Sequence, residues 1–128
     1  MPKLKTFIVE DNPVILKNLI ATLEDLSDVQ VVGSAGSERE AVSELQQRDG
    51  QLDLVIVDIF LNSGSGLGVL RSAQNLELPV RRVVLSNYAT PEMRRRCLEL
   101  GADRVFDKSS ELEELIAYCD EAAESQGG

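Results

Sequence analysis

Carboxylates follow two apolar stretches of this chain at the point where each stretch ends. Glu10 and Asp11 come directly after the apolar run 4–9. Asp58 comes directly after the run 54–57. Carboxylate oxygens are good ligands for Mg²⁺, and a carboxylate can also attack phosphorus as a nucleophile. If the two stretches are neighbouring strands, these residue types predict metal-assisted phosphoryl chemistry in one acidic pocket.

Two later apolar stretches also end in polar side chains. Ser86 follows residues 83–85, and Lys108 follows residues 105–107. A hydroxyl group can donate a hydrogen bond to a phosphoryl oxygen, and an ammonium group can neutralise its charge. In a parallel sheet all four strand ends would meet at one edge, which is where open α/β sheets bind ligands.

Repulsion among the acids favours a bound cation. Glu10, Asp11 and Asp58 within a few ångströms of one another need a raised pKa, a basic side chain or a metal to offset their charge. Lys108 supplies a fixed positive charge. Mg²⁺ suits an all-oxygen site of carboxylates, a backbone carbonyl, waters and a phosphate group.

The elements that must position these groups alternate along the chain. Strand-like runs are expected at about residues 4–9, 29–33, 53–58, 82–86 and 104–107. Most of them are continuous β-branched or leucine runs, which is typical of a parallel sheet covered on both faces. Right-handed crossovers then give an α/β fold. We expect a doubly wound five-stranded parallel sheet, flavodoxin-like, in the order 2-1-3-4-5, with five helices.

Helix-starting signals lie between these runs. Each signal is a polar capping residue, a proline at the first helical position, or both. The expected starts are at Asn12-Pro13, at the capping box Ser37–Glu40, near Leu67, at Thr90-Pro91 and at the capping box Ser110–Glu113. Gly101 is expected to end the fourth helix.

Length and charge narrow the class of protein. The chain has 128 residues, which predicts one domain over residues 1–128, with a folded part at about 4–122. Its net charge of −9 argues against direct nucleic-acid binding. The sequence has no apolar run of about 18 residues, so we expect no membrane span. The N-terminus lacks the apolar segment of a signal peptide. We expect a cytoplasmic protein.

Cysteine and histidine usage adds two points. Cys97 and Cys119 lie on helix-like segments without metal-type spacing, so we expect buried thiols in a reducing compartment. The chain contains no histidine, so it cannot be its own phosphohistidine donor.

The order and spacing of these residues resemble the receiver domain of two-component response regulators over about residues 4–122. Gly66-Leu67 and Gly101-Ala102-Asp103 also fit that family. The resemblance implies that Asp58 is the phosphoacceptor, that Lys108 pairs with a phosphoryl oxygen and that Ser86 donates a hydrogen bond to another. It implies a regulatory protein rather than an enzyme.

The resemblance also implies a cofactor and partners. Glu10, Asp11, Asp58 and the backbone carbonyl of Phe60 would hold Mg²⁺, with Mn²⁺ as an alternative. The phosphoryl donor would be a sensor histidine kinase or a histidine phosphotransfer protein. Output would pass through the face made by the fourth helix, the fifth strand and the fifth helix, to a downstream protein or an output domain. Neither nucleic acid nor a membrane is expected to bind this chain directly.

Several residues depart from the family pattern. Ser109 replaces the proline that usually follows the lysine, so we expect either a trans peptide or a strained turn there. Val105 replaces an aromatic switch residue, and Phe106 should point to the other face of the sheet. Phe60 and Tyr88 take two variable positions beside the acceptor, where they are expected to modulate hydrolysis.

Other functions are open at this point. A degenerate receiver that only docks partners remains an alternative, because Val105 and Ser109 depart from the pattern. A Mg²⁺-dependent aspartyl phosphatase usually needs an acid two residues after its nucleophile, where this chain has Phe60. A flavin-binding flavodoxin is disfavoured, since Glu10 and Asp11 would repel a phosphate. Arg94–Arg96 is either a solvated face or a docking patch.

A nucleotide-binding loop is also disfavoured. The glycines of residues 64–68 do not match G-x-G-x-x-G, and no lysine follows in P-loop spacing. We expect these glycines to let the loop turn.

Overall fold

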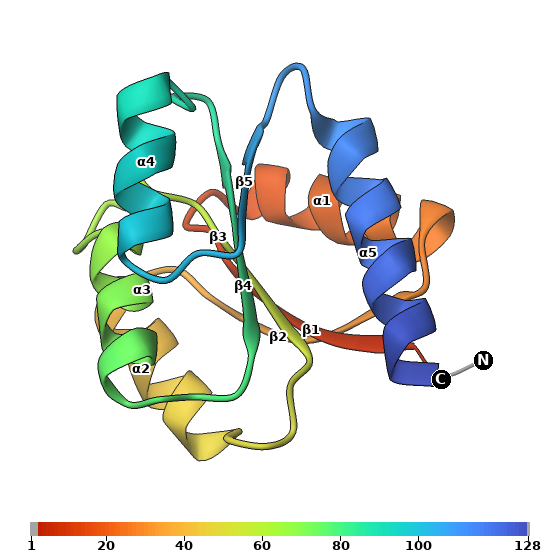
Figure 1. Cartoon of the computed structure of the whole chain (residues 1–128), viewed down its shortest axis with the longest axis horizontal. Coiled ribbons are helices and arrows are strands. Elements are labelled where there is room, and N and C mark those ends of the chain that lie inside the picture. The colour runs from red at the N-terminus through yellow and green to blue at the C-terminus, as the bar shows by residue number, and fades with distance from the viewer. Residues whose placement is uncertain (1–2, 128) are drawn as a thin grey trace.

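The computed structural model describes residues 3–127, and the side chains of residues 3–125. Strands and helices alternate along the chain (Figure 1). The elements are β1 (Leu4–Val9), α1 (Pro13–Leu26), β2 (Val29–Ala35), α2 (Glu38–Gln47), β3 (Leu54–Val57), α3 (Gly66–Asn75), β4 (Arg81–Ser86), α4 (Pro91–Glu99), β5 (Arg104–Asp107) and α5 (Leu112–Gly127).

The five strands form one parallel sheet in the order β2-β1-β3-β4-β5. The expected flavodoxin-like order is therefore confirmed. All four residues of β3 are buried, because this central strand is covered on both faces. β1 and β3 pair in register up to Val9 and Val57, so the residues after them start side by side.

Helices cover both faces of the sheet, as expected for a doubly wound fold. α1 and α5 lie on one face, while α2, α3 and α4 lie on the other (Figure 1). Each face has its own apolar core. Phe106 and Leu115 pack in the first core, and Val57 and Val69 pack in the second.

Most helix starts agree with the sequence. Asn12, Ser37 and Thr90 cap α1, α2 and α4, since their side-chain oxygens accept backbone N–H groups of the first turn. α3 begins at Gly66, one residue before the expected start, because Ser65 caps it. Gly101 follows α4 with a φ of 101°, which suits its expected role as a helix terminator.

The start of α5 is the exception. The box expected at Ser110–Glu113 does not account for this helix start, because an earlier acid organises the turn. The Asp107 carboxylate accepts N–H bonds from Ser109 and Ser110. In the expected box the Glu113 carboxylate would accept the Ser110 N–H, but the Asp107 carboxylate accepts that N–H instead.

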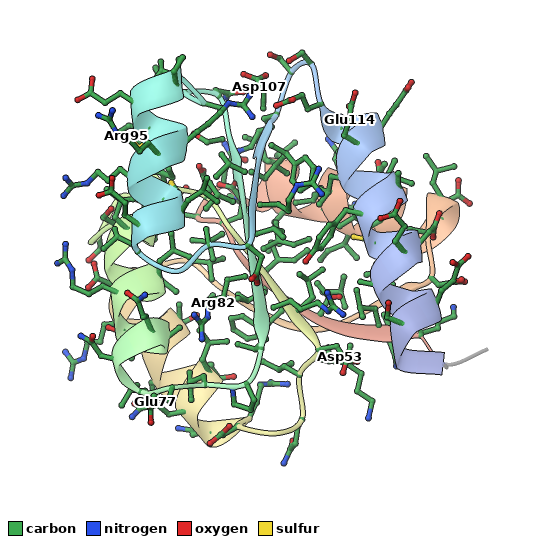
Figure 2. The ribbon with its side chains drawn as sticks, viewed as in Figure 1. Asp53, Glu77, Arg82, Arg95, Asp107 and Glu114 are labelled. Atoms are coloured by element: carbon green, nitrogen blue, oxygen red, sulfur yellow. The ribbon has the colours of Figure 1, made fainter. Side chains whose placement is uncertain are left out.

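Arg82 lies toward the opposite edge of the sheet, where the parallel strands begin. Arg82 donates to the carbonyls of Leu78 at 2.7 Å and of Ala73 and Gly101 at 3.4 Å. These carbonyls lie at or beyond the C-terminal ends of α3 and α4, where a cation is favourable. Figure 2 shows Arg82 and Asp53 toward that edge and Asp107 at the opposite one.

Candidate functional site

Three carboxylates meet at the C-terminal edge of the sheet. Ligand atoms of Glu10, Asp11 and Asp58 lie within 4.8 Å of one another. The juxtaposition follows from the pairing of Val9 with Val57, which brings the ends of β1 and β3 together. The predicted acid cluster is thus formed.

Lys108 reaches this cluster from β5. Its Nζ lies 2.9 Å from Glu10 Oε1 and 3.5 Å from Asp58 Oδ2. The side chains of Lys108, Glu10 and Asp58 are only 17%, 3% and 14% exposed, so these ion pairs are weakly screened by solvent. The Lys108 backbone N–H also donates to the Ser86 carbonyl at 2.9 Å, which ties the ends of β4 and β5.

The charge of the cluster leaves Asp58 in an unfavourable position. Burial raises the pKa of Asp58 above its usual value of 3.8, and the nearby Glu10 carboxylate adds to that rise. Lys108 acts in the opposite direction without cancelling the effect. An additional cation beside Asp58 would favour its ionised form.

Two of the acids also accept hydrogen bonds from backbone N–H groups. Glu10 Oε2 accepts the Asn12 N–H at 3.1 Å, and Asp11 Oδ2 accepts the Asn62 N–H at 2.6 Å. Asp11 therefore links the loop after β1 to the loop after β3. Part of the acids' role in the structure described here is to fix these two loops.

Ser86 is fully buried at the end of β4. Its Oγ accepts the Tyr88 N–H at 3.0 Å. The hydroxyl proton stays available for another acceptor, because a hydroxyl group can accept and donate at once.

Phe60 and Tyr88 form an aromatic pair beside the site. Their ring centroids lie 4.8 Å apart in an edge-to-face arrangement. The residues are 53% and 60% exposed, so the pair is a surface feature at the loops after β3 and β4. Sequence spacing singled out both residues, but it gave no sign that the rings contact each other.

Val105 and Phe106 point to opposite faces of β5. Val105 packs with Val84 and Cys97 in the core beneath α4, and Phe106 packs with Leu115 in the core beneath α5. The expectation that Phe106 cannot take over the position of Val105 is confirmed. The Lys108–Ser109 peptide is trans.

The glycines after β3 have packing reasons. A Cβ on Gly66 would lie 2.2 Å from the Asp58 carbonyl oxygen, and a Cβ on Gly68 would lie 2.3 Å from the Glu38 carboxylate carbon. Glu38 Oε1 accepts the Ser65 N–H at 2.9 Å at the start of α3. Close contacts with Asp58 and Glu38 explain these glycines without a nucleotide.

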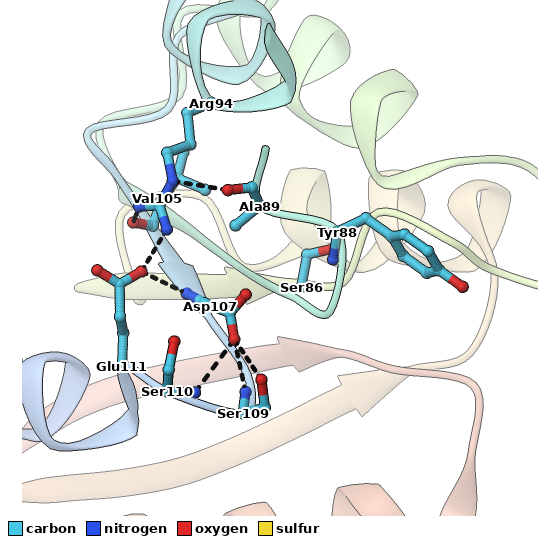
Figure 3. A network of polar contacts seen from close by, with 9 residues as sticks. All are labelled: Ser86, Tyr88, Ala89, Arg94, Val105, Asp107, Ser109, Ser110 and Glu111. Atoms are coloured by element: carbon cyan, nitrogen blue, oxygen red, sulfur yellow. Dashed lines mark hydrogen bonds and ion pairs between the residues drawn. The ribbon is translucent and has the colours of Figure 1, made fainter. Parts of the chain in front are cut away.

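The residue pattern does not predict the polar network around the turn after β5. Arg94 forms an ion pair with Glu111, and Asp107 accepts hydrogen bonds from Ser109 and Ser110 (Figure 3). Arg94 was expected to lie on a solvated face or a docking patch with its two neighbours, but its side chain is half-buried in this network. The Asp-x-Ser-Ser pattern was the signal for the turn, whereas nothing in the sequence singled out Arg94 from Arg95 and Arg96.

Both cysteines are buried, as the sequence predicted. Cys97 and Cys119 are buried free thiols. Burial raises the pKa of Cys119 to about 12, which makes a reactive thiolate unfavourable there.

Every helix within residues 3–127 is too short or too polar to cross a membrane.

A profile of the response regulator receiver domain matches residues 6–120. The virulence transcription regulator BvgA of Bordetella pertussis is 30% identical over 112 residues, which is 88% of this chain and 52% of that protein. A transcriptional regulator of Pseudomonas aeruginosa is also 30% identical, over 88% of this chain and 53% of its own length.

Solved structures show the same fold. The signal receiver domain of NarL from Mycobacterium tuberculosis superposes with a TM-score of 0.85 at 22% identity, covering 97% of this chain and 98% of that one. CheY of Borrelia burgdorferi, in a complex with CheX, BeF₃ and Mg²⁺, superposes with a TM-score of 0.77 at 19% identity, covering 90% and 88%.

The chain spans about half the length of the curated relatives it matches. The family profile, in contrast, covers most of the chain, and its match includes the acid cluster, Ser86 and Lys108. The chain belongs to the response regulator receiver domain family.

Proposed function

We propose that this chain is a phosphorylation-activated signalling switch whose phosphoacceptor is Asp58. The observation that carries the proposal is the ion-pair geometry of Lys108, whose Nζ bridges Glu10 and Asp58 at 2.9 and 3.5 Å. Phosphoryl transfer depends on positioning and charge neutralisation more than on covalent help from the protein. A buried carboxylate with an ammonium group fixed beside it meets both needs.

The transfer step follows from these groups. An oxygen of the Asp58 carboxylate attacks the phosphorus of a phosphohistidine on a partner, so a P–O bond forms while the P–N bond breaks. The electron pair of the P–N bond stays on the imidazole, which takes a proton from solvent and leaves neutral. Lys108 then pairs with one phosphoryl oxygen, and the Ser86 hydroxyl donates to another.

Mg²⁺ is the proposed cofactor, held by Glu10, Asp11, Asp58 and the Phe60 carbonyl, with Mn²⁺ as an alternative. The donor set fits, since it is made of oxygen ligands and the pKa of Asp58 is raised where a cation would lower it. When bound, the ion neutralises charge on the phosphoryl oxygens. The structure of CheY with BeF₃ and Mg²⁺ supports this assignment for the same fold.

The proposed partners follow from the family and from the surface. A sensor histidine kinase or histidine phosphotransfer protein would supply the phosphoryl group, in the cytoplasm. Output would use the α4-β5-α5 face, where Arg95 and Glu114 project from α4 and α5 (Figure 2). Because the curated relatives are transcription regulators about twice as long, an output domain or a separate downstream protein would read this face.

The test is phosphorylation by a small donor. The purified chain is incubated with acetyl phosphate and Mg²⁺, and its intact mass is measured. We expect a gain of one phosphate that is lost in Asp58→Asn and in EDTA. Asp53→Asn is the matched control, because Asp53 lies just before the same strand at the opposite edge of the sheet and should leave the gain unchanged. Failure of the wild type to gain phosphate would favour a docking module that works without phosphorylation.

A further inference from the structure

The turn that carries Lys108 is held by an aspartate at its start. Asp107 Oδ1 accepts the Ser109 N–H at 2.9 Å, the Ser109 hydroxyl at 2.6 Å and the Ser110 N–H at 3.1 Å. Along the chain Lys108 lies between the acceptor and these donors, so the hydrogen bonds drawn in Figure 3 span its backbone.

Glu111 closes the same turn from its other end. Its Oε1 accepts the Asp107 N–H at 2.8 Å, and its own N–H donates to the Asp107 carbonyl at 2.9 Å. The two acids are thus joined reciprocally, one through its side chain and one through its main chain. The backbone on both sides of Lys108 is fixed without a proline.

Arg94 fastens this turn to α4 and to the loop after β4. Its guanidinium group lies 2.5 Å from Glu111 Oε1, and it donates to the Val105 carbonyl at 3.1 Å and to the Ala89 carbonyl at 2.8 Å. Ala89 is three residues after Ser86. One side chain therefore connects the loop that presents the Ser86 hydroxyl with the turn that presents the Lys108 ammonium group (Figure 3).

A fixed turn matters because a lysine side chain is long and flexible. Its Nζ must reach Glu10 and Asp58 from a strand that is not adjacent to theirs. A displacement of the backbone at Lys108 would move the ammonium group away from the position of the transferred phosphoryl group. Misplacement by about 1 Å can slow a reaction by up to about a hundredfold.

We propose that Asp107, Glu111 and Arg94 are positioning residues for phosphoryl transfer, which hold Lys108 and the Ser86 loop in one rigid frame. The inference rests on the proposed function of Asp58. None of the three touches the reacting atoms, so they act only through the residues that they hold.

The electrostatics of the frame agree with this role. Hydrogen bonds, first those from Ser109, hold the pKa of Asp107 below its usual value of 3.8. Contacts with Arg94 and then with the Asp107 backbone lower the pKa of Glu111 from 4.5. Both carboxylates therefore remain ionised acceptors at neutral pH.

The experiment compares substitutions that keep or remove the acceptor oxygen. Asp107→Asn retains an Oδ1 acceptor, while Asp107→Ala removes it; Glu111→Gln and Glu111→Ala form the second pair. Glu113→Ala is the control, since Glu113 is an exposed acid on the first turn of α5. The initial rate of phosphorylation by acetyl phosphate with Mg²⁺ is measured, together with amide exchange of residues 107–111 before phosphorylation.

We expect Asp107→Ala and Glu111→Ala to lower the rate about tenfold and to speed exchange in the turn. The amide variants should keep at least about a third of the wild-type rate, since they retain an acceptor. Equal rates in the alanine and wild-type proteins would overturn the inference and leave the proposed function intact. A wild type that gains no phosphate would overturn both. If Asp107→Ala fails to fold, the Glu111 pair decides the question by the same criteria.

Discussion

Two sets of carboxylates lie at one edge of the sheet in opposite electrostatic situations. The site cluster is Glu10, Asp11 and Asp58, and the turn pair is Asp107 and Glu111. In the site cluster, burial and a neighbouring acid raise the pKa of Asp58. In the turn pair, hydrogen bonds lower both pKa values.

Both sets consist of Asp and Glu, so they differ in the hydrogen-bond and ion-pair partners of their carboxylates. The turn pair accepts hydrogen bonds from backbone groups and from Arg94, so its charge is already stabilised. The site cluster has more negative charge than Lys108 can neutralise. A set of acids whose charge is compensated within the protein stiffens a loop, whereas a set left short of positive charge favours binding of a cation.

Replacement of Lys108 should change the unfolding free energy more than any substitution in either set. Lys108→Met leaves Glu10 and Asp58 without their ammonium partner, and removing one partner of such buried pairs costs roughly 3–5 kcal/mol of unfolding free energy. The measurement is urea unfolding at neutral pH without divalent ions. Arg95→Met is the control, since the Arg95–Glu99 pair is 72% and 69% exposed and contributes less than about 0.5 kcal/mol. A similar loss in both variants would contradict the shortage of positive charge in the site cluster.

Mg²⁺ should stabilise the protein through the site cluster alone. At a concentration ten times its dissociation constant, a ligand that binds only the folded state adds about 1.4 kcal/mol to the unfolding free energy. We expect this gain in the wild type and in Asp107→Asn, measured by urea unfolding against EDTA samples. In Asp58→Asn the same concentration should give less. An equal gain in Asp58→Asn would place the ion elsewhere.

The two sets should respond to pH with opposite signs, in the absence of divalent ions. The folded-state pKa of Asp58 is raised, so the folded state binds its proton more tightly and stability falls as pH rises from 3.8 through the folded value. The turn pair has lowered pKa values, so its contribution is present above the unfolded values and is lost as pH falls through the folded ones.

Unfolding curves at a series of pH values in EDTA separate the two signs. Relative to the wild type, Asp58→Asn should gain stability as pH rises above 3.8, whereas Asp107→Asn should lose stability as pH rises toward 3.8 from below. Glu113→Gln controls for the change of net charge. Parallel profiles for the two aspartate variants would show that the environments of the two sets do not differ as described.

The sequence was sufficient to predict which strands position the site. The strand ends at Val9 and Ser86 were predicted and the end at Val57 was predicted to within one residue, because the apolar run of a central parallel strand stops where polar residues begin. The positions of the acids then follow from strand order. This is why the acid cluster, Ser86 and Lys108 meet where the residue pattern indicated.

Side-chain partnerships could not be predicted in the same way. Arg94, Arg95 and Arg96 have the same residue type on one helix, and only the packing of α4 against β5 turns the first of them inward. Asp107 and Ser110 are both residue types that cap backbone N–H groups. Which of them does so depends on the path of the turn. The Phe60–Tyr88 contact joins loops from different strands, and no local pattern encodes it.

The smallest expected effect concerns the lifetime of the phosphoryl group. Hydrolysis of an acyl phosphate needs a water in line with phosphorus, opposite the Asp58 oxygen. We expect the Phe60–Tyr88 pair to crowd this approach, because the rings rest edge to face at 4.8 Å on the two loops beside the acceptor. Neither ring carries a carboxylate or an amide that could orient the attacking water.

Loss of phosphate from the purified protein with Mg²⁺ tests this shield. Phe60→Asn removes one ring and adds an amide that can orient water, so hydrolysis should quicken by about threefold or more. Tyr88→Ala breaks the same ring contact without adding a polar group, so it isolates the effect of crowding. Leu98→Ala, at an exposed apolar residue of α4, serves as the control. If the wild type loses phosphate as fast as both ring variants, the rings do not shield the phosphoryl group. Their exposed faces would then be better explained as contacts for the phosphoryl donor, because they lie where that partner must approach Asp58.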